Sequence, residues 1–114
     1  MDFNVNETRL LAMLSLAKKA GKLVTGEEGC EKAIQKGEAK IVFLATDASK
    51  NTHKKFNNKT TFYKVPIHSI FTKDVMGQHI GSHSRATIVV VCENFAKKMN
   101  ELIEKCRGGN LPPE

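Results

Sequence analysis

The side chains that could coordinate a metal are few in this sequence. His79 and His83 are four residues apart, a spacing that places two ligands on one face of a helix. Gly81 lies between them and is expected to end that helix, and no nearby carboxylate or thiol completes a ligand set. The alternative is two ordinary loop histidines. We predict no metal site and no cofactor.

Nucleophiles and general bases are not paired in any recognisable motif. Three cysteines, an odd number without Cys-x-x-Cys spacing, are expected to be reduced and buried, as in a cytoplasmic protein: Cys30, Cys92 and Cys106. Adjacent Glu27 and Glu28 fall at an expected helix start, where carboxylates favour the helix dipole more often than they serve acid–base catalysis. Phosphate-binding loops, serine-hydrolase elbows and zinc-protease motifs are absent. The sequence therefore predicts a protein without catalytic activity.

Positive charge is concentrated in one quarter of the chain. The 114 residues carry a net charge of +6, and within residues 47–73 six lysines face Asp47 alone, a net charge of +5. Two interpretations are open: a solvated basic face, or a surface that contacts a polyanion such as nucleic acid. Aromatic residues are sparse, unlike those of RNA modules that stack bases on a sheet. No apolar run approaches the ~20 residues of a membrane span, so no membrane partner is expected.

Helical and extended patterns alternate along the chain. Continuous apolar runs at 41–45 and 87–92 are typical of strands buried on both faces. The other expected strands are 22–25 and 62–65, the latter ending at Pro66. The expected helices are one capped by Asn6 and ending at Gly21, one from Thr25 or Gly26 to Gly37, a basic one within 47–59, one capped by Thr72 and ending at Gly81, and one capped by Asn94 and ending at Gly108–Gly109.

This alternation predicts an α/β sandwich with helices on both sides of a small sheet. The length suits a single domain, which we place at residues 1–107, followed by a flexible C-terminal tail at 108–114.

Three segments together resemble a known family. They are Thr25–Ile34 (TGEEGCEKAI), Ile41–Lys55 (IVFLATDASKNTHKK) and Val75–Val91 (VMGQHIGSHSRATIVVV). In this order and spacing they resemble the bacterial YlxQ-type ribosomal-protein-like family, within the ribosomal protein L-seven-Ae superfamily, whose best-known members bind kink-turn RNA. The resemblance extends from about Asn6 to Cys106. It implies a three-layer α/β/α sandwich around a four-stranded mixed sheet.

The resemblance also implies an RNA-reading helix start. RNA-binding relatives carry Gly-x-Asn-Glu-x-x-Lys there, which maps onto residues 26–32. Gly26 and Lys32 match, whereas Glu28 and Gly29 replace the Asn and Glu. Gly26 would let the backbone approach RNA closely, and Lys32 would neutralise a phosphate. Glu28 could accept hydrogen bonds from a guanine edge.

A second implied contact is the loop before the last strand. Relatives place apolar side chains there against extruded bases, where this chain has Ser82 and Ser84. Arg85 could stack on a base or grip a phosphate in a bidentate manner, and His83 could stack. We predict that His83, Ser84 and Arg85 contact RNA.

The basic segment begins near the same expected edge. Lys50, Lys54 and Lys55 follow the end of a buried strand, where ligands of open α/β sheets gather. They are expected to position phosphates without reading sequence.

The leading hypothesis is thus a non-catalytic, monomeric RNA-binding protein of the cytoplasm that contacts structured RNA, of kink-turn or ribosomal type. The alternative is a protein-interaction module on a ribosome or translation-factor assembly, with little or no RNA binding. The acidic pair Glu27–Glu28 and the polar Ser82 and Ser84 favour this alternative.

Overall fold

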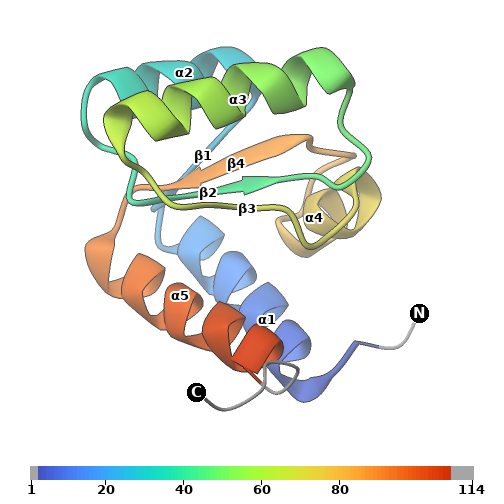
Figure 1. The fold of residues 1–114 in the computed structure, drawn as a ribbon. Coiled ribbons are helices and arrows are strands. Elements are labelled where there is room, and N and C mark those ends of the chain that lie inside the picture. Colours follow the sequence, from blue (N-terminus) through green and yellow to red (C-terminus); the bar gives the residue numbers. More distant parts are fainter. Residues whose placement is uncertain (1–2, 109–114) are drawn as a thin grey trace.

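A computed structural model describes residues 3–108, with the side chains described up to Lys105. Within that part a four-stranded sheet has the order β1-β4-β2-β3 and lies between two layers of helices (Figure 1). The strands are β1 (Leu23–Thr25), β2 (Ile41–Leu44), β3 (Ile67–His68) and β4 (Thr87–Val90). The helices are α1 (Val5–Lys19), α2 (Glu27–Gln35), α3 (Lys50–Tyr63), α4 (Lys73–His79) and α5 (Glu93–Gly108). The expected three-layer α/β/α sandwich around a four-stranded mixed sheet is confirmed.

The direction of β4 makes the sheet mixed. It pairs antiparallel with both β1 and β2, whereas β2 and β3 pair in parallel. Thr25 pairs with Ile88, and Leu44 pairs with Thr87. The ends of β1 and β2 and the beginning of β4 therefore lie together at one end of the sheet, which we call the α2 edge because α2 begins there.

The two central strands divide the core into two clusters. Ile41 and Phe43 pack among residues of α1, α4 and α5, whereas Val42 and Leu44 pack among residues of α2 and α3. All four side chains are buried. Alternate residues of a strand point to opposite faces, so the continuous apolar run fills both layers at once.

The ends of the first and last helices differ from the expected ends. The N-cap of α1 is Asn4, not Asn6: its side chain accepts the amide of Glu7 at 2.8 Å, and Glu7 accepts the amide of Asn4 at 3.0 Å. This reciprocal capping box satisfies two amides that a helix start otherwise leaves free. Asn94 lies inside α5, which begins one residue earlier, at Glu93.

The strand expected at residues 62–65 is wrong. Phe62 and Tyr63 belong to the last turn of α3, and the strand that follows it begins after Pro66, at Ile67. The backbone turns at Lys64, whose φ of 57° is left-handed. Of the tail expected at 108–114, Gly108 is the last residue of α5, and 109–114 lie outside the described residues.

Candidate nucleic-acid interface

The residues expected to contact RNA converge on the α2 edge. The helix start at Gly26 follows β1, Lys50 opens α3 after β2, and residues 82–86 lead into β4. Backbone bonds join these segments: the amide of Ala45 donates to Ala86 at 2.8 Å, and the amide of Arg85 donates to Lys73 at 3.1 Å. Segments up to sixty residues apart in the chain therefore share one end of the sheet.

Gly26 shapes the start of α2 through its backbone. Its φ of 88° is left-handed, and a Cβ at this position would meet nothing within 4 Å. Glycine is thus required by conformation rather than by crowding. No side chain caps this helix start, and the first bond of the helix runs from the amide of Cys30 to Gly26 at 3.0 Å. Among the described helices with an assigned N-cap, this one alone lacks a side-chain cap.

Two of the expected phosphate-binding lysines are paired with carboxylates. The Nζ of Lys55, on α3, lies 3.2 Å from Glu27 and 2.8 Å from Glu31, both on α2. These contacts, with Glu31 the larger cause, raise the pKa of Lys55. Lys32 lies 3.3 Å from Glu28, one turn earlier in α2.

Lys50 and Lys54 have a different environment. Both are exposed, and no carboxylate of the described residues lies within 4 Å of either Nζ. Of the lysines expected to contact RNA, the two without a carboxylate partner among the described residues therefore lie in the first turns of α3, whereas Lys32 and Lys55 are paired with carboxylates of α2.

The loop before β4 rests on α4. A Cβ on Gly77 would lie 1.5 Å from the carbonyl oxygen of His83, so the loop backbone occupies the place of a side chain. The amide of Ser82 also donates to the carbonyl of Gly77 at 2.8 Å. This contact holds His83 and Ser84 in exposed positions.

Arg85 is half-buried beside this loop. Its Nε is buried and has no hydrogen-bond partner within the described part of the chain. A buried guanidinium donor left without an acceptor costs free energy.

Asp47 is a positioning residue that sequence reasoning missed. Its Oδ1 accepts the amide of Lys73 at 2.9 Å and so joins the loop after β2 to the start of α4. An aspartate just after a buried strand was the available signal, but its partner is 26 residues away and only the fold brings the two together.

The groups considered for other chemistry are dispersed. The Nδ1 of His79 lies 2.9 Å from the carbonyl of Val75, and the part of the chain that the structure describes holds no metal-binding group of three or more His, Cys, Asp or Glu residues. Cys30 is buried, and burial raises the pKa of its thiol to about 11. Cys92 is half-buried. The side chain of Cys106 is not among those that the structure describes. No described helix is both long and apolar enough to cross a membrane.

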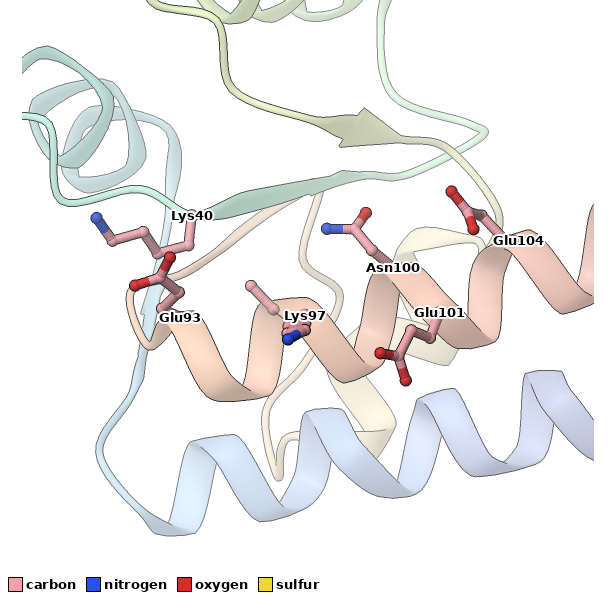
Figure 2. A pocket seen from close by; sticks show the side chains of 7 residues that line it. Lys40, Glu93, Lys97, Asn100, Glu101 and Glu104 are labelled. Atoms are coloured by element: carbon pink, nitrogen blue, oxygen red, sulfur yellow. The ribbon is translucent and has the colours of Figure 1, made fainter.

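A separate hollow of about 400 Å³ lies along α5 (Figure 2). Lys40, which precedes β2, lies at its rim with Glu93 and Lys97, and Asn100 and Glu104 project beneath the strands. None of the residues expected to contact RNA lines this hollow.

Taken together, the sheet order and the cluster at the α2 edge define an α/β/α protein in which a helix start and two loops meet at one end of the sheet. The model of the ribosomal protein L7Ae/L30e/S12e/Gadd45 family matches residues 8–103. The chain belongs to this family.

Relatives of similar length support the assignment. The chain is 43% identical over 99 residues to a protein of Enterococcus faecium named RNA-binding protein YlxQ, with 87% of this chain and 95% of that protein covered. It is 39% identical over 92 residues to the protein of the same name in Bacillus subtilis (strain 168), with 81% and 92% covered.

Solved structures share the fold. A protein of unknown function from Bacillus halodurans C superposes with a TM-score of 0.82 at 36% identity, covering 84% of this chain and 97% of that one. The Giardia lamblia 15.5kD RNA binding protein superposes with a TM-score of 0.77, covering 95% and 92%. At 15% identity, the second comparison bears on the fold alone.

Proposed function

We propose that this protein is a non-catalytic RNA-binding protein that contacts structured RNA, of kink-turn or ribosomal type, at the α2 edge. The observation that carries the proposal is the convergence there of Gly26, Lys50 and the loop holding Arg85. Two relatives at 43% and 39% identity are named RNA-binding proteins, which supports the proposal.

Different groups at this edge suit different parts of an RNA. Lys50 and Lys54 are charged and unpaired, as phosphate contacts require, and they would set the register of the RNA without reading its sequence. His83, Ser84 and Arg85 lie on a loop braced by α4, where a base could stack or form hydrogen bonds. The uncapped start of α2 would offer backbone amides to an oxygen of the ligand.

The ion pairs with glutamates make Lys32 and Lys55 less available for phosphate contacts. Glu28 and Glu27 already hold their ammonium groups, so a phosphate would have to compete with these carboxylates. We therefore place Lys32 and Lys55 at the surface as charges that compensate the acidic helix start, and Lys50 and Lys54 as the main phosphate contacts.

The test is the affinity for a kink-turn RNA and for a plain duplex, measured over a range of salt concentrations. Binding that weakens with salt and favours the kink-turn RNA is expected, since each phosphate contact releases counterions. Arg85→Ala should weaken kink-turn binding by about 1–3 kcal/mol, whereas Arg9→Ala, at an exposed position of α1, should leave it unchanged. Undetectable binding of both RNAs at micromolar protein and low salt would refute the proposal.

A charge variant tests the role of the acidic helix start. Glu27→Gln removes a negative charge near the RNA and loosens the hold on Lys55. RNA affinity should rise by about fivefold, the effect of roughly 1 kcal/mol of relieved repulsion. Glu104→Gln makes the same charge change on α5 and should have no effect. Equal effects of the two variants on RNA affinity would show that Glu27 does not lie near the bound RNA.

The ion pairs also favour the second candidate, a protein-interaction module on a translation assembly. A surface where Glu27, Glu31 and Lys55 are mutually paired is less positive than the net charge suggests. Pull-down from nuclease-treated lysate separates the two candidates, because retention of a protein partner without RNA supports the module.

A further inference from the structure

The outward face of α3 begins at the α2 edge, with Lys54, and extends beyond it along the helix. Lys54, Asn58 and Phe62 are four residues apart and therefore lie in one row along the helix. All three are exposed, and the buried residues of the same helix, Phe56 and Thr60, lie on the opposite side. The row runs away from the α2 edge, because β3 pairs in parallel with β2 and α3 must return to its beginning.

Phe62 at the end of this row is exposed without a packing role. Its side chain is 78% exposed, the highest value among the large apolar residues described, and it belongs to neither core cluster. Its ring meets that of Tyr63 edge to face, with centroids 4.9 Å apart at 75°. This contact steadies the ring and leaves the exposed face of Phe62 free to stack.

The charge of α3 is positive only. The helix contains four lysines and no acidic residue. Of these lysines, Lys55 faces α2 and is paired there, whereas Lys50, Lys54 and Lys59 have no carboxylate within 4 Å in the described part of the chain. Lys50 and Lys54 are four residues apart and lie on one face of the helix, where cations without a carboxylate partner suit a polyanion.

Single exposed apolar side chains are common and by themselves indicate nothing. The combination in this row is more specific, because lysine, amide and aromatic ring are the three groups that hold unpaired nucleotides. Lysine contacts phosphate, an amide can contact a base edge, and a ring stacks on a base. Between Lys50 and Phe62 the helix advances about 18 Å, which gives room for several nucleotides.

We propose that the α3 row, Lys54, Asn58 and Phe62, is a binding site for an unpaired RNA segment that continues from structured RNA held at the α2 edge. A base stacks on Phe62, and the phosphates that lead from the edge to that base pass Lys54, which the edge and the row share. The proposal rests on the proposed function, since the structured part of the RNA would be bound at the α2 edge.

The test compares three kinds of RNA with the full chain by fluorescence anisotropy. The three kinds are a kink-turn hairpin, two versions of that hairpin with a single-stranded tail of roughly ten uridines at one end or at the other, and the tail alone. We expect one tailed hairpin to bind more tightly than the bare hairpin. Phe62→Ala should weaken tailed-hairpin binding by about fivefold or more, the fold-change of ~1 kcal/mol of base stacking, and leave bare-hairpin binding unchanged.

Matched variants control for apolarity and charge. Leu16→Ala removes an apolar side chain that is 55% exposed on α1, and it should not alter the gain from the tail. Lys54→Gln should weaken binding of the bare hairpin and should also reduce the gain from the tail and its salt dependence, whereas Lys18→Gln, the same change on α1, should do neither. Photocrosslinking of a 4-thiouridine tail should label the peptide that holds Phe62. Because Phe62 is exposed, circular dichroism should show Phe62→Ala folded.

The outcomes separate this proposal from the proposed function. If the bare hairpin binds but neither tail adds affinity, or if Phe62→Ala leaves the gain from the tail intact, the binding site proposed at the α3 row is refuted. The proposed RNA contact at the α2 edge is then still supported. If only the tail binds, and does so through Phe62, the RNA contact proposed at the α2 edge is refuted, whereas the α3 row is supported as a site for unpaired RNA. If no RNA binds, both fail, and a protein that crosslinks through Phe62 would identify a different partner.

Discussion

Gly77 shows how a single residue shapes the candidate interface. In most helices an alanine stabilises relative to glycine, yet here its Cβ would lie 1.5 Å from the carbonyl oxygen of His83. We predict that Gly77→Ala destabilises the protein by about 1–3 kcal/mol through overpacking and weakens RNA binding, because the loop must move. Urea unfolding and RNA titration measure the two effects. Gln78→Ala, at the exposed neighbouring position, should change neither, and a stabilised Gly77→Ala protein would contradict the close approach.

Cys30 gives a prediction about pH at the same scale. Burial raises the pKa of its thiol from 9.0 to about 11, and the Sγ donates to the carbonyl of Val24 at 3.3 Å. Between these two values the unfolded chain loses the thiol proton while the native protein keeps it. Stability should therefore fall as pH rises from 9.0 toward 11, by up to about 1.4 kcal/mol per pH unit.

The variant Cys30→Ala isolates this effect from the titration of lysines. Urea unfolding at pH 8 and pH 10 should show a larger loss of stability for the wild type than for the variant. An equal loss in both proteins would mean that the thiol ionises as readily in the native state as in the unfolded chain.

At the scale of elements, four helices end in the same way. After α1, α2, α3 and α4 the chain forms paired backbone bonds around a left-handed residue, the Schellman motif. In three of them that residue is a glycine: Gly21, Gly37 and Gly81. In α3 it is Lys64, whose amide donates to Thr61, while the amide of Val65 donates to Thr60 at 2.9 Å.

We predict that Lys64→Gly stabilises the protein by about 0.5–1 kcal/mol. Glycine adopts a left-handed φ without the steric cost that lysine bears, although it loses more chain entropy on folding. Urea unfolding measures the difference, with Lys36→Gly at a right-handed C-cap as the control, which should destabilise. Destabilisation by Lys64→Gly would show that the lysine side chain contributes more than the backbone strain costs.

This helix end is also where the sequence pattern misled. Residues 62–65 combine aromatic and β-branched residues before a proline, as strands do, but Phe62 and Tyr63 are held in α3 by helix bonds that continue to Lys64. A left-handed lysine gives no signal comparable to that of glycine at the other three helix ends. The strand itself is short because β3 pairs with β2 through only two residues.

At the scale of the whole molecule, the two core clusters share the central strands. Phe43 belongs to one cluster and Leu44, the next residue of β2, to the other. Neither helical layer can separate without exposing the buried side chains on the face of the sheet that it covers. We predict a single cooperative unfolding transition.

Two probes with different locations test the cooperativity. Tyr63, the only tyrosine, reports on α3 by its fluorescence, and far-ultraviolet circular dichroism reports on all helices. Their urea transitions should coincide. A fluorescence transition at lower urea would show that the α2–α3 layer opens by itself.

Local patterns in the sequence determined most of the elements and the fold class. The apolar runs at 41–45 and 87–92 marked strands buried on both faces, and Thr72 marked the start of α4, because short-range periodicity and capping act within a few residues. The family was recognisable from the same segments. The residues expected at the interface came from that resemblance, and their contact with RNA stays a prediction.

Only the tertiary structure decided which charges are available and where they lie. The sequence lists Lys55 and Lys54 as equivalent neighbours, but α3 packs beside α2, so Lys55 is held by Glu27 and Glu31 while Lys54 points outward. The packing of the loop of His83 on Gly77 likewise depends on a contact through space. Electrostatic pairing and close packing depend on distances between residues remote in the chain, and those distances are properties of the fold.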